Sequence, residues 1–169
     1  IIDALVEKNV AAGNTAPLYH YLSQPEVTEA EASARFADML EYTGCPGYIV
    51  HMTCEGALNA VRRATTRNQK IFVETCSQYL MIDASLYERE DGAKWVMSPP
   101  LREKKDQEAL WSGINQGLIQ VVGTDHCPFM LEQKAMGKDN FAKIPNGHPA
   151  IEHRMEFMYS EGVRKGRIS

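Results

Sequence analysis

The sequence lacks the features that mark exported, membrane-spanning and nucleic-acid-binding proteins. No apolar run approaches the ~18 residues of a transmembrane helix, and there is no signal-peptide pattern. The four cysteines form neither a CxxC pair nor a secreted-scaffold spacing, which favours reduced thiols in a cytosolic protein. A net charge of -4 with interspersed signs argues against nucleic acid as the main partner. We therefore expect a cytoplasmic protein that binds neither membranes nor nucleic acids.

Internal repeats, low-complexity tracts and linkers are also missing. The composition, 44% hydrophobic and 24% charged, is ordinary for a soluble globular protein, and 169 residues can form one domain with a sizeable core. Both ends look cut, because the chain opens at Ile1 within what resembles a helix and closes at 166–169 on what resembles the start of another element. We expect residues 1–169 to be an excerpt of a longer protein.

Helical patterns alternate with short apolar runs along the chain. One helix should end near Gly13, a second should run from a capping box at 28–31 to Gly44, a third should be capped by Thr53, and a fourth should cover 102–116. Strands are expected at 48–51, 71–74 and 118–124. Strands separated by helices predict right-handed βαβ units and a parallel sheet, so the expected fold class is α/β.

Polar side chains stand at the end of each expected strand. These are His51, Glu74 and Asp125. The carboxyl ends of parallel strands share one edge of a sheet, so groups far apart in the sequence converge there. Neutral imidazole and carboxylate are suitable ligands for Zn²⁺ or a similar divalent ion. The pattern therefore makes this edge a candidate metal site.

Each of these residues also has a plain structural interpretation. A histidine after a strand is more often a hydrogen-bonded core or surface residue, and Asp125 could form an Asx-turn with the residues that follow it. For Glu74 the favoured role is capping the turn at 75–76. His126 could hydrogen-bond to a metal ligand and orient it, or it could be an ordinary loop residue. The remaining histidines are expected to be solvated; they are His20, His148 and His153.

The cysteines offer another metal hypothesis. Cys54, Cys76 and Cys127 all lie within a few residues of expected strand ends, so a mixed histidine and cysteine zinc site is conceivable. Small buried thiols that pack beneath loops are the favoured interpretation.

Five sequence blocks carry a resemblance to a known family. The chain resembles the cyclic amidohydrolases, most closely the dihydropyrimidinase and hydantoinase branch. The most specific blocks are Ser-Pro-Pro-Leu-Arg-Glu-Lys at 98–104 and Asp-His-Cys-Pro-Phe at 125–129. The others are Tyr-Ile-Val-His-Met-Thr-Cys at 48–54, Glu-Thr-Cys-Ser-Gln-Tyr-Leu at 74–80 and Lys-Ile-Pro-Asn-Gly at 143–147. The resemblance implies a TIM-type (β/α)₈ barrel, with residues 1–169 as the C-terminal part of its catalytic domain, containing strands six to eight.

The resemblance also implies a metal centre and a substrate site. The family holds two divalent metal ions, usually zinc, and His51 matches its strand-six histidine ligand. Asp125 matches the strand-eight aspartate, which is both a metal ligand and the catalytic acid-base. Backbone groups at Ser98 and Asn146 match those that hold the imide ring of the substrate. The remaining ligands, a His-x-His pair, a bridging carbamylated lysine and a strand-five histidine, fall outside this sequence.

The activity implied is hydrolysis of the cyclic amide bond of dihydropyrimidines or 5-substituted hydantoins to N-carbamoyl amino acids, by a homo-oligomer (tetramer or dimer). An allantoinase or a dihydroorotase is the alternative enzyme. The alternative of another class is a non-catalytic dihydropyrimidinase-related structural or signalling protein; such proteins lose metal ligands, so His51 and Asp125 favour an enzyme. The sequence departs from the family at Ser77, His148 and His153, where proline, glycine and aspartate are common.

Overall fold

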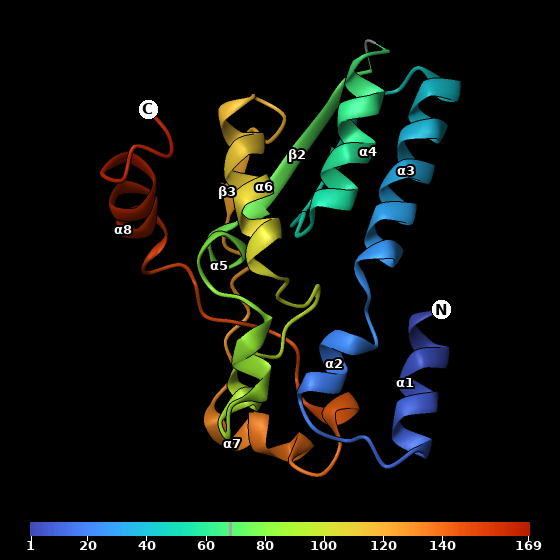
Figure 1. Cartoon of the computed structure of the whole chain (residues 1–169), viewed down its shortest axis with the longest axis vertical. Coiled ribbons are helices and arrows are strands. Elements are labelled where there is room, and N and C mark those ends of the chain that lie inside the picture. Colours follow the sequence, from blue (N-terminus) through green and yellow to red (C-terminus); the bar gives the residue numbers. More distant parts are fainter. Residues whose placement is uncertain (68) are drawn as a thin grey trace.

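The structure is a computed structural model that describes residues 1–67 and 69–169. The molecule is elongated, with the strands, α3, α4 and α6 in one half and α1, α2 and α7 in the other (Figure 1). The strands are β1 (Gly47–Ile49), β2 (Ile71–Cys76) and β3 (Val121–Gly123). The α-helices are α1 (Ile2–Ala11), α2 (Leu18–Leu22), α3 (Glu26–Thr43), α4 (Glu55–Thr65), α5 (Ser77–Met81), α6 (Lys104–Asn115), α7 (Leu131–Lys134) and α8 (Arg154–Phe157).

The strands form a parallel sheet in the order β1-β2-β3, with Ile49 beside Val73 and Cys76 beside Gly123. In sequence, α4 lies between β1 and β2, and α6 between β2 and β3. The predicted parallel α/β sheet is confirmed. The predicted strand limits were wrong, since β1 and β3 are shorter and β2 is longer than expected. In β3 the reason is that the amides of 118 and 119 bond to the Gly113 carbonyl in α6 instead of to a strand.

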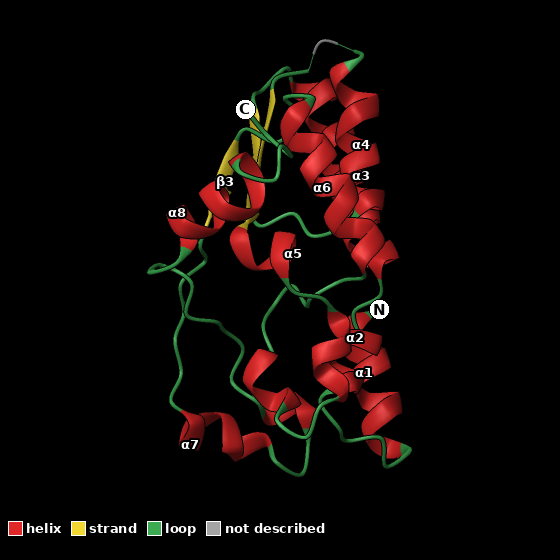
Figure 2. Ribbon diagram, turned by 60° about the vertical axis from the view of Figure 1, so that its left-hand side comes forward, coloured by secondary structure: helices red, strands yellow, loops and turns green. Residues whose placement is uncertain are grey.

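Helices cover one face of the sheet (Figure 2). Leu58, Val61 and Ala64 of α4 face the core and have no exposed surface. Helix α6 approaches this layer closely at Gly113, where a Cβ atom would meet Leu58 Cδ2 at 2.9 Å and Ile119 Cδ1 at 3.0 Å. The core therefore lies between the sheet and its helices, and its packing fixes where the strand ends lie.

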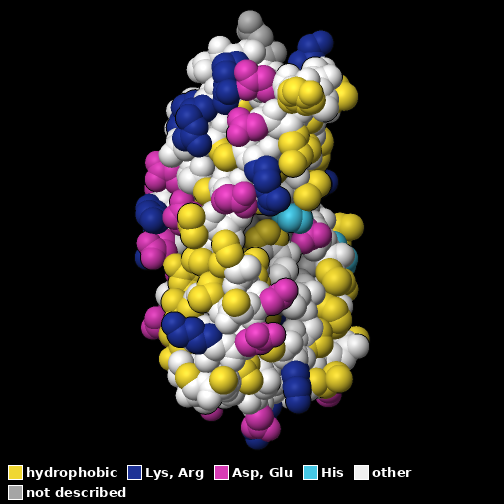
Figure 3. All heavy atoms as spheres, turned by 90° about the vertical axis from the view of Figure 1, so that its right-hand side faces the viewer, with side chains coloured by type: hydrophobic (Ala, Val, Ile, Leu, Met, Phe, Trp, Pro, Cys, Tyr) yellow, Lys and Arg dark blue, Asp and Glu magenta, His cyan; other side chains and the backbone are white. Residues whose placement is uncertain are grey.

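The opposite face of the sheet carries large apolar side chains that remain in contact with solvent. Tyr48, Phe72 and Val121 are 46%, 51% and 37% exposed. Tyr48 pairs with Phe72, and Val121 pairs with Glu74, so all of them project from the same side of the sheet. Apolar side chains also gather along the right-hand edge of Figure 3, whereas charges of both signs are spread over its upper half.

Three predicted helix starts were wrong, those of α3, α4 and α6. Helix α3 begins at Glu26 after Pro25, and Thr28 Oγ1 donates to the Pro25 carbonyl (2.8 Å) instead of forming a capping box with Glu31. Helix α4 has Cys54 at its N-cap position, because the Thr53 side chain bonds to Glu29. The predicted end of α3 at Gly44 is confirmed, and this glycine has the left-handed φ of 70° that favours it there.

Asp106, a buried residue in the first turn of α6, joins the beginnings of two helices. One carboxylate oxygen accepts the Glu103 amide just before α6 (3.2 Å), and the other accepts the Glu55 amide at the start of α4 (3.0 Å). Burial raises the pKa of Asp106.

The predicted start of α6 at 102 was early by two residues, because Arg102 is buried in the interior and lies before the helix. Among the described residues, no helix is both long enough and apolar enough to cross a membrane.

Candidate functional site

The two predicted metal ligands share an unusual backbone conformation. His51 and Asp125 each lie two residues beyond the end of a strand, with φ angles of 38° and 45°. Of the described residues other than glycine, they alone have a positive φ. Such a conformation costs about 1–3 kcal/mol per residue and is concentrated at functional sites. The left-handed turn also explains why β1 and β3 end before these residues.

The sheet brings His51 and Asp125 to the same edge, on the two strands that flank β2. At about 4.8 Å per strand, the two chains run roughly 10 Å apart. Within the described residues, neither the His51 ring nor the Asp125 carboxylate has a hydrogen-bond partner, so Asp125 forms no Asx-turn. An imidazole and a carboxylate that are both free suit a divalent metal. No group of three potential metal ligands occurs among the described residues.

Glu74 supports His51 from the middle strand. Its carboxylate accepts the Tyr48 hydroxyl (3.0 Å) and the His51 amide (3.4 Å). It also lies against Gly123, where a Cβ atom would meet Glu74 Cδ at 2.8 Å. The prediction that Glu74 caps the turn at 75–76 was wrong, because its carboxylate crosses to the neighbouring strand.

A buried ion pair behind this edge was missed by the sequence analysis. Arg102 Nη2 lies 3.1 Å from Glu29 Oε2, and the two side chains are 5% and 16% exposed. Arg102 Nε donates to Thr53 Oγ1 (2.9 Å), and the Thr53 amide donates to Glu29 Oε1 (2.7 Å). The pair therefore connects α3, the segment after His51 and the segment after Ser98. The sequence signal that could have revealed this ion pair is the arginine in the block at 98–104, one of the two most specific blocks of the resemblance.

The segments that contain Ser98 and Asn146 lie side by side. The Gly147 amide donates to the Val96 carbonyl (3.1 Å), although the two residues are far apart in the sequence. Pro99 lines the same hollow of about 290 Å³ as His51, which brings the Ser98 segment toward the edge of the sheet. The Cys127 amide donates to the His148 carbonyl (3.2 Å), which ties the loop after Asp125 to the Asn146 segment.

His20 holds the segment before Ser98. It is 5% exposed, and its Nε2 donates to the Met97 carbonyl (2.7 Å). Desolvation by burial lowers its pKa. Gln24, one turn further on, lies near the Ser98 hydroxyl, which donates to Gln24 Oε1 (3.5 Å). The prediction that His20 is solvated was wrong.

The other histidines organise the loop beyond Asp125. His126 Nδ1 accepts hydrogen bonds from the backbone amides of residues 150 and 151 at 3.2 and 3.3 Å. These bonds favour a role within the loop over a role in orienting a metal ligand. His148 is partly buried and stacks on Trp95, with ring centroids 5.8 Å apart, and burial lowers its pKa. The predicted solvation of His148 was therefore wrong. His153 is exposed, as predicted.

The cysteines do not form a zinc site within the described residues. Cys54 and Cys76 are fully buried, and burial raises both pKa values, that of Cys76 to about 12. These two confirm the interpretation as thiols packed beneath loops. Cys127 is exposed, so it departs from that interpretation.

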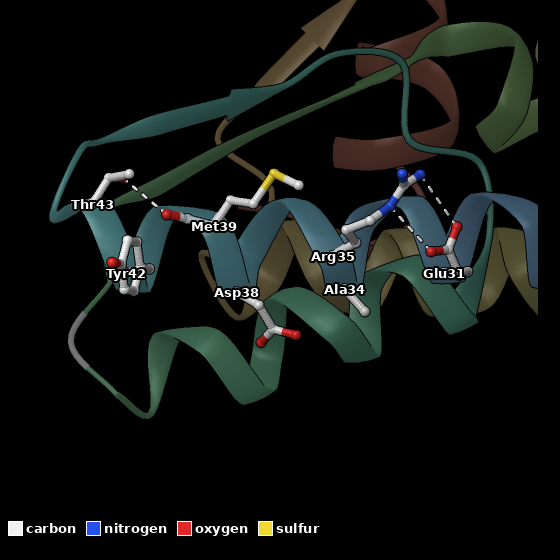
Figure 4. Close-up of a pocket in the computed structure, with 7 residues that line it drawn as sticks. All are labelled: Glu31, Ala34, Arg35, Asp38, Met39, Tyr42 and Thr43. Atoms are coloured by element: carbon white, nitrogen blue, oxygen red, sulfur yellow. Dashed lines mark hydrogen bonds and ion pairs between the residues drawn. The ribbon is translucent and has the colours of Figure 1, made fainter.

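Two further hollows lie on the surface of the molecule. One of about 290 Å³ is lined by Trp95, His148 and Phe157, among others. The other, of about 720 Å³, is a shallow hollow lined by α3 and Thr43 at its end, where Arg35 pairs with Glu31 (Figure 4). Because its lining comes from a single helix and no strand end reaches it, the second hollow is not the site.

Comparison with known proteins supports the resemblance, although no family model matches the chain. The chain is 47% identical over 162 residues to a D-phenylhydantoinase of Escherichia coli O81 (strain ED1a), covering 95% of this chain and 35% of that protein. The crystal structure of dihydropyrimidinase from Brevibacillus agri NCHU1002 superimposes with a TM-score of 0.98 at 44% identity, covering 100% of this chain and 37% of that one. A D-hydantoinase from a Bacillus sp. AR9 gives a TM-score of 0.98 at 46% identity, with coverage of 100% and 38%.

The similarity to these proteins extends over nearly the whole of this chain, both in sequence and in structure. The chain spans about a third of the length of the curated relatives that it matches, 35% in the first of them. In sequence and in fold, this chain is therefore a relative of the dihydropyrimidinases and D-hydantoinases, equivalent to one segment of those proteins.

Proposed function

We propose that this chain is part of a metal-dependent hydrolase that opens the cyclic amide of dihydropyrimidines or 5-substituted hydantoins to N-carbamoyl amino acids. The observation that carries the proposal is the position of His51 and Asp125 at one sheet edge, both with a left-handed backbone conformation. Neither side chain has a hydrogen-bond partner among the described residues. These two occupy the positions of a metal-ligating histidine and aspartate in the family that the chain resembles.

Residues 1–169 are proposed to form the C-terminal part of a TIM-type barrel domain, with β1, β2 and β3 as strands six to eight. Two features support this arrangement. Among the described residues the strands pair in parallel, and α3, α4 and α6 cover one face of the sheet. The apolar side chains of Tyr48, Phe72 and Val121 on the other face are of the kind that fills a barrel interior.

His51 and Asp125 are proposed as two ligands of a binuclear centre, most simply of zinc, whose further ligands would come from outside this chain. Bound divalent ions supply a lowered water pKa and a polarised substrate carbonyl. Asp125 takes the proton of the attacking water and then delivers it to the leaving ring nitrogen. Backbone groups at Ser98 and Asn146 orient the imide of the ring. Glu74 holds the His51 backbone in place during this sequence.

The direct test is an assay of the complete protein, purified and loaded with zinc. Turnover of hydantoin or dihydrouracil, lost on chelation and restored by zinc, is the expected result. Allantoin and dihydroorotate serve as comparison substrates, and a clear preference for either would replace the proposed substrate class. Absence of turnover on all of them would support the non-catalytic alternative.

Two further proposals have their own tests. Gel filtration of the same sample tests whether the protein is a tetramer or a dimer, and cell fractionation tests whether it is cytoplasmic.

The side chain of Ser98 is expected to be dispensable. Because the proposed contact comes from the backbone, Ser98→Ala should change kcat/KM by less than about ten-fold, within the loss of ~1 kcal/mol associated with one weak hydrogen bond. The hydroxyl makes only a long bond to Gln24 (3.5 Å). Steady-state kinetics of the complete enzyme give the answer, and loss of most activity would assign a role to the hydroxyl.

Residues 1–169 by themselves are expected to bind zinc weakly and to have no turnover. Two ligands rarely hold zinc tightly, and the described residues supply no group of three. The uncovered apolar sheet face should also make the isolated piece aggregate or pack loosely. Zinc titration, an activity assay and a thermal melt measure these properties. Stoichiometric tight zinc with turnover would show that the ligands were assigned wrongly.

A further inference from the structure

Lys134 is a buried lysine whose role is not explained by the proposed reaction. It is 4% exposed and lies at the end of α7. Its Nζ donates to three backbone carbonyl oxygens, those of Val96 (2.6 Å), Pro145 (2.7 Å) and Gly147 (2.9 Å). An ammonium group has three N–H donors, so all of them are used. Within the described residues, no carboxylate forms an ion pair with it.

The three carbonyl groups belong to the two segments proposed to hold the substrate. Val96 precedes Ser98 by two residues, and Pro145 and Gly147 flank Asn146 on both sides. The Gly147 amide also donates to the Val96 carbonyl (3.1 Å), so this carbonyl accepts from both Lys134 and Gly147. Gly147 is closely packed as well, since a Cβ atom there would collide with the Cys127 carbonyl oxygen.

We propose that Lys134 is a positioning residue that fixes the Ser98 and Asn146 segments relative to each other, and thereby sets the geometry that grips the substrate ring. The inference rests on the proposed function of these two segments. Three short bonds that converge on one atom hold the carbonyl groups within a narrow range of separations. Without the ammonium group, three carbonyls would lose their shared donor in a buried place, and the segments would move apart.

A direct chemical role for Lys134 does not fit its surroundings. Burial lowers its pKa to about 8, which leaves the group mainly protonated at pH 7. A protonated amine with all three N–H groups engaged has no free lone pair for proton abstraction or attack. The centroid of the Phe129 ring lies 5.4 Å from Lys134 Nζ, so the ring forms a cation–π contact with the ammonium group.

The test uses the complete enzyme with Lys134→Met, Lys134→Arg and the control Lys138→Met, which changes an exposed lysine of the same segment. Displacing a substrate-positioning group by an ångström can cost about a hundred-fold, so Lys134→Met should lower kcat/KM by about that factor, mainly through KM. Lys134→Arg keeps the charge but cannot place three donors at one point, and its KM should rise by about ten-fold. Lys138→Met should match the wild type, and the metal content should be equal in all variants.

Kinetic constants within two-fold of wild type in both Lys134 variants would overturn the inference, even if their melting temperatures fall. If Lys134→Met does not fold, Lys134→Arg alone decides by the same criterion.

A second measurement separates this inference from the proposed function. Hydrogen–deuterium exchange of peptides spanning 141–150, followed by mass spectrometry, reports the Gly147 bond to Val96 without any substrate. Exchange should be faster in the Lys134 variants than in Lys138→Met. If the wild type has no activity on cyclic amides but the exchange difference is found, the proposed function fails while the positioning role of Lys134 stands. Unchanged exchange would remove that role.

Discussion

Replacing Asp125 with asparagine in the complete enzyme is expected to lower kcat by about 10²–10⁴-fold, the usual contribution of a general acid-base. The amide of asparagine cannot take the proton of the attacking water. The fold should survive, because asparagine tolerates the left-handed conformation that Asp125 adopts (φ 45°). The experiment measures kcat, bound metal and the melting temperature of each variant on the same preparation.

The matched control for this variant is Asp139→Asn, which changes an exposed aspartate in the following loop and should leave kcat unaltered. The expected pattern is a large loss of turnover in Asp125→Asn with a smaller loss of metal and little change in melting temperature. Turnover within a few-fold of the wild type would remove Asp125 from the reaction. A loss of turnover proportional to the loss of metal would leave it as a ligand only.

The second large effect concerns stability. Arg102→Met should lower the free energy of unfolding by about 3–5 kcal/mol, because it leaves the carboxylate of Glu29 largely buried without its counter-charge. The Thr53 hydroxyl would lose a donor in the same change. Urea denaturation followed by circular dichroism measures the loss.

Helix α3 provides the control for this prediction. Arg35 pairs with Glu31 at 3.1 Å in the exposed hollow of Figure 4, where the side chains are 61% and 56% exposed. Solvent screens such a pair, so Arg35→Met should cost only about 0–1 kcal/mol. The double variant Arg102→Met with Glu29→Gln should recover part of the loss, since no buried charge then remains unpaired. Equal losses for the Arg102 and Arg35 variants would contradict the role given to the buried pair.

The alternation of helices with short strands, and hence the parallel sheet, could be predicted from the sequence. These features depend on local apolar periodicity, which is visible along the chain at α4, where Leu58, Val61 and Ala64 share one face. Gly44 as the end of α3 follows equally from local chemistry. The positions of His51 and Asp125 just beyond two strands could also be predicted, because each follows a short apolar run.

The burial of particular polar residues could not be predicted, because it depends on contacts between distant parts of the chain. His20 donates a hydrogen bond to the Met97 carbonyl, and Arg102 donates one to the Gln24 carbonyl. Lys134 donates hydrogen bonds to carbonyl groups of two segments that are distant in the sequence. The partners in these bonds lie up to 78 positions apart in the sequence, so no local pattern distinguishes these residues from solvated ones. Burial of a polar group is tolerated only where distant segments supply its hydrogen bonds. The arrangement of those segments is set by the packing of the whole core, and for that reason the support of the site became visible only in the folded chain.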